Sequence, residues 1–569
     1  MTIKANPAPV DTAQDLRNRP WLKAYPDGIS WERSFKPGLV HKLLDDAVAA
    51  FGTRPCTYFL GKRLSYAEIG ALSDRAAKGL RALGVGEGVK VGLLLPNSPT
   101  FVIFYFGVLK AGGTVVNFNP LYSLEEIEFQ IRDSDTKIMV TLDLALLFDK
   151  AEAMLKSGAL DKAVVAKFTS LLPPLKQVGV KLSGRVKRAR VGLSRMRRQI
   201  VREAELLAND GRYERPVITP DASPCCSTPA APRARPRAPC SPMRISPSTW
   251  RRSSGGSGRR RLSDRVLGAL PLFHVFAMTT VMNFGVASGM EMILMPKFEL
   301  VQALKLIGKL KPTMMPGVPT LYQAMVRHPR IKRFDLSSLA FCISGAAALP
   351  LEVKRGFEAL TGCNLVEGYG LSETSPVATC NPLDVTREGS IGLPLPGTEI
   401  SIRSLEDPAQ EVARGEPGEI CIAGPQVMTG YWKKPEETEQ AFTGRFFRTG
   451  DVGTMDEEGF VFIVDRIKDM INAAGFKVYP RRVEDALYAH SAVAECCVVG
   501  VPDAYRGEAP KAYVKLKEGS TATAVELMAF LRPKLSKLEL PVAIEFREEL
   551  PKTMIGKLSK KELRAQAGH

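Results

Sequence analysis

Residues 89–132 read VKVGLLLPNSPTFVIFYFGVLKAGGTVVNFNPLYSLEEIEFQIR, and this stretch decides the fold class. The apolar runs 89–95 and 113–118 have the length and the flanking Pro, Asn and Gly residues of buried strands. Residues 100–111, between these runs, and residues 123–132, after them, predict helices. Strands that alternate with helices indicate parallel pairing. We therefore expect an α/β fold of layered βα units with parallel-rich sheets.

The same signals extend along the chain and divide it into two domains. Residues 65–83 carry apolar side chains at about every third or fourth position and predict an amphipathic helix. Ser123 and Glu126 have the spacing of a capping box, which predicts a helix start. We expect a large N-terminal domain over 30–464, which ends in short strands with Gly/Pro turns that form a small β-rich subdomain. A small α+β C-terminal domain is expected over 465–569.

Composition excludes several classes of protein. A chain of 569 residues, 45% apolar and 24% charged, is globular and too long for one hydrophobic core. Its ten cysteines show no metal-binding spacing and its start lacks an apolar signal core, which predicts a reduced, cytoplasmic compartment. The net charge of +18 arises in residues 167–202, with eleven Lys and Arg, and 222–263, with nine Arg, and neither stretch has an acidic residue. The rest is close to neutral, which argues against a nucleic-acid binder.

Residues 367–373, EGYGLSE, carry side chains that suit a nucleotide. The two glycines let the backbone approach a ligand closely, and Tyr369 offers a flat face to a purine. Ser372 supplies a hydroxyl for phosphate, and Glu373 supplies a hard oxygen for Mg²⁺. An ordinary glycine-rich turn with a solvated glutamate is the alternative.

Four other places are candidates from their residues alone. Residues 344–350, SGAAALP, can let adenine lie against the backbone, although a tight strand-to-helix turn explains them equally well. Asp451 can accept hydrogen bonds from both ribose hydroxyls, or cap a turn. Lys557 can neutralise charge during phosphoryl chemistry, or remain solvated. His274 lies in an apolar run, where a satisfied core histidine is the common alternative.

Four separated elements resemble, in order and spacing, the motifs of the adenylate-forming superfamily: residues 367–373, Asp451, the pair Asp465-Arg466, and residues 551–557 (PKTMIGK). The resemblance implies that a carboxylate and ATP form an acyl-adenylate with the help of Mg²⁺, and that the acyl group then passes to a thiol. It also implies that the C-terminal domain is a mobile lid, with its hinge at Asp465-Arg466.

The resemblance assigns roles to individual residues. The nucleotide-binding residues that it implies are Gly345, Ala346, Ala347, Gly368, Tyr369, Gly370, Leu371, Ser372, Asp451 and Arg466. The catalytic residues that it implies are Lys557, Ser372 and Glu373, and Glu373 is also the expected metal ligand. His274 corresponds to a position that borders the acyl pocket, which implies substrate positioning.

Three stretches are similar to bacterial long-chain fatty-acid–CoA ligases: residues 21–25, 315–320 and 424–432. Only twelve residues follow Lys557, too few for a carrier-protein domain, so coenzyme A is the expected thiol. A medium-chain or aryl-acid CoA ligase and a non-catalytic acyl-adenylate-binding remnant are the alternatives. The Met-rich stretch 278–295 suits an acyl tunnel and suits a protein core equally well.

Residues 167–202 mix basic side chains with apolar ones, as segments that bind an anionic bilayer without spanning it do. A solvated basic surface is the alternative. We expect a cytoplasmic protein, peripheral on the inner face of the cell membrane, whose partners are a fatty acid and coenzyme A and no nucleic acid. A homodimer is left open.

Residues 222–263 depart from the family pattern, with seven Pro, nine Arg and no Lys, Asp or Glu. The family has a strand here, followed by a Gly/Thr/Ser-rich loop and a lysine that grip the ATP phosphates. Read in a shifted frame from Ser227 onward, permitted codons give YTGGTTGTPKGAMLTH, which is such a loop. We infer a reading-frame shift that is restored by Asp264, and we expect the chain as written to be impaired in adenylation. A disordered Arg/Pro linker and a nucleic-acid-binding arm are the alternatives.

Overall fold

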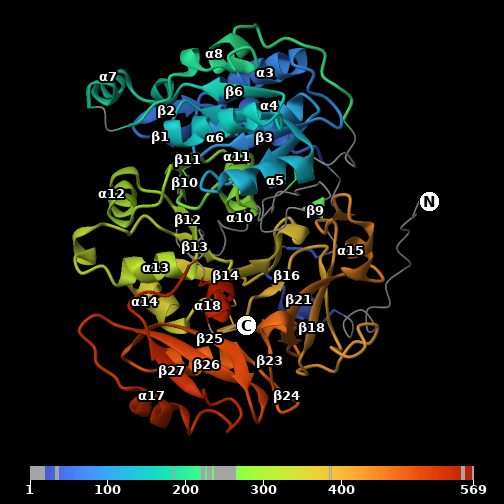
Figure 1. Cartoon of the computed structure of the whole chain (residues 1–569), viewed down its shortest axis with the longest axis vertical. Helices are drawn as coiled ribbons and strands as arrows, with labels where there is room; N and C mark the ends of the chain where they lie inside the picture. The colour runs from blue at the N-terminus through green and yellow to red at the C-terminus, as the bar shows by residue number, and fades with distance from the viewer. Residues whose placement is uncertain are drawn as a thin grey trace.

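The computed structural model describes most of the chain, in the ranges 19–27, 29–31, 38–183, 186–218, 225–226, 234–235, 264–383, 385, 387–552 and 558–566. Figure 1 shows the two α/β layers of the N-terminal domain above the C-terminal domain, with a β-rich subdomain at the right of the view. The expected division into a large α/β domain and a smaller C-terminal domain is confirmed.

The first sheet has six strands in the order β7-β6-β5-β3-β4-β8, and every neighbouring pair is parallel. Its strands are β3 (Lys90–Leu94), β4 (Thr114–Asn117), β5 (Thr136–Leu142), β6 (Lys162–Ala166), β7 (Ile200–Arg202) and β8 (Cys225–Cys226). Its helices are α3 (Tyr66–Ala82), α4 (Pro99–Lys110), α5 (Leu124–Ser134), α6 (Ala145–Lys156), α7 (Pro174–Ser183) and α8 (Glu203–Leu206), with 3₁₀ turns η2 (Phe168–Leu171) and η3 (Val191–Leu193).

The local predictions for this layer are confirmed. Helix α3 begins after Ser65, whose side chain caps it. Helix α5 begins with the predicted capping box, because Glu126 N–H donates to Ser123 Oγ at 3.2 Å and Ser123 N–H donates to a Glu126 carboxylate oxygen at 2.8 Å. Every residue of α4 is buried, so its apolar sequence belongs to the core. No helix in the described ranges is long and apolar enough to cross a membrane.

The second sheet has nine strands in the order β16-β15-β14-β13-β12-β10-β11-β1-β2, parallel from β14 to β1 and antiparallel at both ends. The strands are β1 (Pro55–Phe59), β2 (Lys62–Ser65), β10 (Arg265–Gly268), β11 (Glu291–Leu294), β12 (Met314–Gly317), β13 (Phe341–Ser344), β14 (Asn364–Gly370), β15 (Val377–Cys380) and β16 (Leu393–Pro394). The helical segments are α2 (Lys42–Phe51), α10 (Val275–Ala277), η4 (Met278–Asn283, π-helical), α11 (Phe284–Ala287), α12 (Leu300–Leu310), α13 (Pro319–Val326), η5 (Ile331–Arg333), α14 (Leu351–Thr361) and η6 (Ser372–Thr374).

The β-rich subdomain is an antiparallel sheet, as expected from its short strands and Gly/Pro turns. It contains β17 (Glu399–Arg403), β18 (Gly418–Ala423), β20 (Phe442–Thr443), β21 (Phe446–Met455), β22 (Val461–Arg466) and helix α15 (Pro435–Gln440). A separate pair joins β19 (Gly430–Tyr431) to β9 (Ala234–Arg235). The N-terminal turn η1 (Pro20–Ala24) buries Trp21 against this subdomain.

The C-terminal domain has its own core and its own mixed sheet. Its elements are η7 (Ile467–Asp469), β23 (Ile471–Ala473), β24 (Phe476–Val478), α16 (Pro480–Tyr488), β25 (Val493–Asp503), β26 (Gly507–Leu516), α17 (Ala524–Leu531), β27 (Ala543–Phe546) and α18 (Lys560–Gln566). The expected α+β class is confirmed. Strand β22 continues through Asp465-Arg466, so the proposed boundary at 464/465 lies inside a strand and not after it.

One buried cation connects α4 to two other helices, α2 and α3. Lys110, at the end of α4, is 1% exposed, and its ammonium lies 2.8 Å from a carboxylate oxygen of Asp45 in α2 and of Asp74 in α3. Arg215 pairs with the same two carboxylates. Burial alone would raise the pKa of Asp45, but hydrogen bonds from Arg215 and Lys110 outweigh it and hold that pKa below its usual value.

We predict that the double substitution Asp45→Asn and Asp74→Asn lowers the free energy of unfolding by about 3–5 kcal/mol, because it leaves a buried ammonium without a counter-charge. Urea unfolding monitored by circular dichroism measures the change. The matched control is Asp335→Asn, which breaks the exposed pair with Lys311 and should lower the free energy of unfolding far less than the double substitution.

The same network predicts a pH dependence. Because the folded pKa of Asp45 is lowered, its contribution to stability is complete above its unfolded pKa of about 4 and is lost as the pH falls through the folded value. The stability difference between the native protein and the double variant should therefore shrink on acidification below about pH 4. A difference that is independent of pH would contradict this role for Asp45.

Candidate active site

Two neighbouring strand ends of the nine-stranded sheet bring the glycine-rich motifs together. Strands β13 and β14 are parallel, with Ser344 opposite Glu367, so the segments that follow them leave the same edge. A Cβ on Gly345 would lie 3.1 Å from the ring of Phe276 and 3.4 Å from the carbonyl oxygen of Gly368. Only a residue without a side chain fits there without displacing the ring. Ala346, the next residue, has a φ of 68°, which is unusual for a residue with a Cβ.

The motif EGYGLSE does not begin as a loop. Strand β14 continues through Gly370 and changes partner, from parallel β13 to antiparallel β15. At Gly370 a Cβ would lie 1.6 Å from the carbonyl oxygen of Pro376, so the close hairpin requires glycine. The chain then turns through η6, where Leu371 N–H donates to Thr374 Oγ1 at 2.9 Å. Ser372 begins this turn.

Tyr369, Asp451 and Arg466 meet although they lie far apart in the sequence. Tyr369 Oη donates to Asp451 Oδ2 at 2.7 Å, and Arg466 Nε lies 3.0 Å from Asp451 Oδ1. Asp451 is 3% exposed. In the pairing of β21 with β22, Asp451 is opposite Arg466, which explains why the two side chains meet. Burial, with the nearby Asp451 charge, keeps the pKa of Tyr369 well above its usual value, so the phenol remains a donor.

One turn of the β-rich subdomain contacts both the side chain and the backbone carbonyl of Glu373. Tyr431 Oη donates to Glu373 Oε1 at 3.1 Å, and Met428 N–H donates to the Glu373 carbonyl at 2.8 Å. Burial raises the pKa of Glu373. Tyr431 is itself positioned by Thr438, whose Oγ1 accepts from the Tyr431 N–H at 2.9 Å. The sequence analysis identified residues 424–432 as similar to fatty-acid–CoA ligases but assigned no role to Tyr431.

The turn that carries Tyr431 is also fixed to the six-stranded layer. Lys90, in β3, places its ammonium 3.7 Å from the centroid of the Trp432 ring. Lys433 pairs with Asp135 at 2.7 Å, and Lys90 lies 3.6 Å from the same carboxylate. These contacts connect Glu373 to both layers of the N-terminal domain.

Glu367 is a second acidic residue at this edge, and the sequence analysis assigned it no role. Burial raises the pKa of Glu367 to about 7, with Arg481 of the C-terminal domain acting in the opposite direction. Leu349 N–H donates to its carboxylate at 3.2 Å, which links β14 to the segment after β13. A glutamate before a glycine-rich motif carries no sequence signal of its environment, because the neighbours that bury it come from other parts of the chain.

Asp465 joins the two domains at the predicted hinge. One carboxylate oxygen accepts from Arg466 N–H at 2.8 Å and the other from Arg481 N–H, at the start of α16, also at 2.8 Å. Asp465 is 5% exposed, and burial raises its pKa. Helix α18 returns to the same place, where Lys560 lies 2.9 Å from Glu484 and Arg564 lies 3.0 Å from Asp469.

His274 is a satisfied, largely buried histidine in this structure. Its Nδ1 accepts from Phe276 N–H at 3.3 Å and caps the short helix α10. Burial lowers the pKa of His274 to about 4, so the ring is neutral at neutral pH. The assignment of His274 to substrate positioning stays a prediction.

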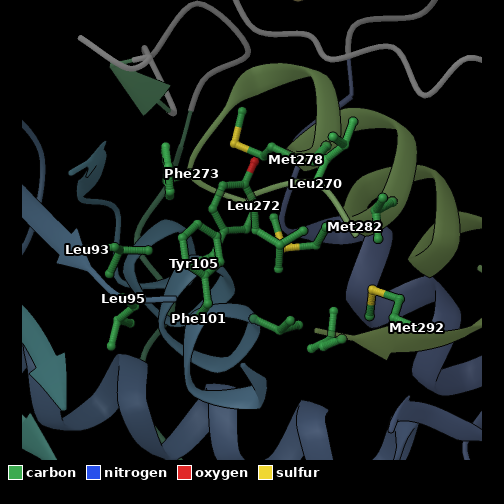
Figure 2. Packing of buried hydrophobic residues seen from close by; sticks show 14 of the residues in the cluster. Leu93, Leu95, Phe101, Tyr105, Leu270, Leu272, Phe273, Met278, Met282 and Met292 are labelled. Carbon is green, nitrogen blue, oxygen red and sulfur yellow. The ribbon is translucent and has the colours of Figure 1, made fainter. Parts of the chain in front are cut away.

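The Met-rich stretch 278–295 belongs to the core. Figure 2 shows Met278 and Met282 near Tyr105 of α4 and Met292 farther to the right on β11, and these side chains are at most 2% exposed. Of the two interpretations drawn from the sequence, the core accounts for the contacts, and a role for this stretch beside an acyl chain stays a prediction.

Two parts of the expected site lie outside the described residues. Lys557 is in the undescribed segment 553–557, whose flanking residues Lys552 and Leu558 form an isolated bridge. Of residues 222–263, only the backbone of β8 and β9 is described. Strand β8 pairs with β4 in parallel, with Cys225 opposite Val115, so the chain leaves it at the carboxyl edge of the six-stranded sheet.

Comparison with known proteins agrees with this geometry. The sequence matches the AMP-binding enzyme family over residues 44–200 and 246–432, and the C-terminal domain of AMP-binding enzymes over 482–557. The interruption at 201–245 overlaps the first half of the aberrant segment 222–263. The chain is 40% identical over 555 residues to the long-chain-fatty-acid–CoA ligase of Bacillus subtilis (strain 168), an alignment that covers 96% of this chain and 97% of that protein.

Solved structures support the same fold. The anthranilate CoA ligase AuaEII in complex with anthranoyl-AMP superposes with a TM-score of 0.79 at 24% identity, over 95% of this chain and 99% of that one. ATP-bound MatB from Rhodopseudomonas palustris superposes with a TM-score of 0.76 at 27% identity, over 94% and 99% of the two chains. With sequence, fold and the arrangement of the motif residues in agreement, the chain belongs to the family of AMP-binding, adenylate-forming enzymes.

Proposed function

We propose that this protein is of the fatty-acid–CoA ligase type. In the first step a fatty-acid carboxylate oxygen attacks the α-phosphorus of ATP, and the bond to pyrophosphate breaks. In the second step the sulfur of coenzyme A attacks the acyl carbon of the adenylate, its proton is lost, and the bond to AMP breaks. The observation that carries the proposal is the contact of Tyr369 and Arg466 with the buried carboxylate of Asp451, which lies near Glu373.

The nucleotide would lie across the edge formed by the ends of β13 and β14. The segment Gly345-Ala346-Ala347 has little side-chain volume and suits contact with adenine, and the ring of Tyr369 supplies the adjoining flat face. Each oxygen of Asp451 already accepts one hydrogen bond and retains a lone pair, so the carboxylate can still accept from ribose hydroxyls. Arg466 fixes that carboxylate and contributes positive charge.

The residues near Glu373 fit a magnesium ion held together with ATP. Within the described ranges, groups of three or more His, Cys, Asp or Glu able to hold a metal are absent. Mg²⁺ commonly takes one carboxylate, substrate phosphates and water, so one glutamate is sufficient. When bound, the ion would neutralise charge on the phosphates. Tyr431 orients the Glu373 carboxylate, and Ser372 offers a hydroxyl to phosphate.

The remaining assignments rest on resemblance and on charge. Lys557 is proposed to neutralise charge between the carboxylate and the α-phosphate, with the C-terminal domain as the lid that delivers it.

The relative from Bacillus subtilis favours a long-chain fatty acid and coenzyme A as substrates. A medium-chain or aryl-acid substrate is the alternative, and rates for a series of acids from aryl to long-chain separate the two. We propose a cytoplasmic protein that meets the inner face of the membrane, with a homodimer left open.

The phosphate loop limits what the chain as written can do. Strand β8 ends at the carboxyl edge of a parallel sheet, which is where anion-binding loops of α/β folds occur. From Ser227 the sequence continues with Pro and Arg in place of the glycines and the lysine of a phosphate loop. We therefore propose that the chain as written has lost its grip on the ATP β- and γ-phosphates.

We predict that restoring the shifted-frame sequence over 227–242 raises ATP–pyrophosphate exchange with a long-chain acid by at least about 100-fold, because preorganised phosphate contacts contribute that much or more to charge stabilisation. The chain as written is the control, and sequencing the genomic DNA across codons 222–263 decides which form is native. Equal exchange by the two proteins would contradict the assigned loss.

A second prediction concerns nucleotide binding and does not need the loop. A non-hydrolysable acyl-sulfamoyl adenosine lacks the β- and γ-phosphates, so calorimetric titration of the full chain tests the Asp451 site directly. Asp451→Asn should weaken binding about 10- to 100-fold, because charged hydrogen bonds contribute about 1.5–3 kcal/mol. Tyr369→Phe should have a smaller effect. Asp161→Asn, at an exposed aspartate before β6, is the matched control, and unchanged affinity in Asp451→Asn would contradict the ribose assignment.

A further inference from the structure

Acidic side chains gather where the two domains meet, close to the hinge. Asp465, at the end of β22, accepts a hydrogen bond from the N–H of Arg481 at the start of α16, at 2.8 Å. Glu367 belongs to the N-terminal domain, on β14, where it is opposite Ser344 of β13. Figure 1 shows this boundary, with β14 and α14 above and α18 and β25 below. The orientation of the C-terminal domain in the structure is here called the docked orientation.

The hydrogen bonds of Glu367 lie within the N-terminal domain. Leu349 N–H donates to its carboxylate at 3.2 Å, and Asn381 N–H donates to its backbone carbonyl at 3.1 Å. Neither contact involves the C-terminal domain, so both can persist when that domain moves. A rotation at the hinge would therefore change the surroundings of the carboxylate and leave its own hydrogen bonds in place.

Charged groups from two helices face this carboxylate. Arg481 and Asp485, on α16 of the C-terminal domain, act on it with opposite signs, and Lys354 acts on it from α14. Arg481 Nε lies 3.9 Å from Asp485, and Lys354 pairs with Glu358. Each of the two cations therefore already has an acidic neighbour. Among the described residues, none forms an ion pair with Glu367.

A carboxylate that loses water without gaining an ion pair holds a proton more tightly. Burial raises the pKa of Glu367 from its ordinary value of 4.5 to about 7, and Arg481 offsets only part of this rise. Burial also raises the pKa of Asp465, although Lys560 and two backbone N–H groups oppose it. The boundary between the domains therefore favours the neutral form of its carboxyl groups.

We propose that Glu367 is a proton-sensitive latch: its protonation favours the docked orientation of the C-terminal domain, and loss of the proton favours rotation of that domain at the hinge. The direct contacts of Gln323 and Arg327 with the carbonyl of Ala494 also hold the docked orientation, and they carry no acidic group. The inference rests on the lid movement proposed above and adds its control by protons. It requires neither ATP nor an acid substrate.

The sign of the effect follows from the two states of Glu367. In a rotated orientation that admits water, the pKa of this carboxyl returns toward its ordinary value of 4.5, whereas in the docked orientation it is about 7. The docked orientation therefore binds the proton more tightly. Its advantage is complete in acid and is lost as the pH rises through about 7.

The test is single-molecule fluorescence energy transfer in the full chain without ligand. The dyes are attached to azidophenylalanine at the exposed positions Lys305 of α12 and Lys537 of the C-terminal domain. The ratio of docked to rotated molecules should rise about 10-fold between pH 8 and pH 6, because one pKa unit is a tenfold change in proton affinity.

Two variants separate the latch from general effects of pH. Glu367→Gln is neutral at every pH, so it should keep the docked orientation favoured and reduce the change between pH 8 and pH 6 to less than about 2-fold. Arg481→Gln removes the charge that opposes protonation and should move the midpoint to higher pH. The matched control is Glu352→Gln, at an exposed glutamate of α14, which should retain the native pH profile. Thermal unfolding verifies that each variant is folded.

The outcomes distinguish the latch from the lid. Two orientations whose ratio does not depend on pH would overturn the latch and leave the lid movement intact. A single orientation at every pH would contradict both. A native pH response in Glu367→Gln would assign the proton to another group, such as Asp465, and would also overturn the proposal.

Discussion

The arrangement of the site depends on one buried carboxylate, that of Asp451. It accepts a hydrogen bond from Tyr369 on β14 and pairs with Arg466 at the end of β22. An aspartate that is 3% exposed is stable in its charged form only when such partners compensate for lost hydration. The same contacts therefore join the nine-stranded sheet, the β-rich subdomain and the connection to the C-terminal domain.

Close backbone approach is the second constraint, and it explains the glycines. Gly345 fits against Phe276 and Gly368, and Gly370 fits against the carbonyl of Pro376, only because they have no side chain. These contacts bring the two strand ends together. The result is a platform of backbone and small side chains, flanked by Tyr369, that suits a flat ligand.

The hinge region shows how the C-terminal domain is attached. Asp465 accepts from the backbone of Arg481, and the side chains of Gln323 and Arg327 in the N-terminal domain donate to the carbonyl of Ala494. These are polar contacts at the surfaces of two domains that have separate hydrophobic cores. Rotation about the hinge would exchange such contacts without opening either core, which is compatible with the proposed movement of the lid.

Local features were predictable because their causes are local. The helices over 65–83 and 123–132 follow from periodicity and from Ser65, Ser123 and Glu126, which cap their own chain. The alternation in 89–132 predicted parallel strands, and β3 and β4 are parallel. The motif residues of the candidate site were identified by resemblance, and of these Tyr369, Asp451 and Arg466 are in mutual contact.

The sequence by itself therefore determined the fold class, the helix starts and most candidate residues of the site. Only the tertiary structure decided that Tyr431 holds Glu373, that burial raises the pKa of Glu367 to about 7, and that Lys110 lies between two carboxylates. It also decided that β14 runs on through Gly370 to pair with β15. The physical reason is that capping and periodicity act over one or two helical turns. Hydrogen-bond partners and burial at these positions depend instead on sheet register and domain packing, which join residues tens of positions apart.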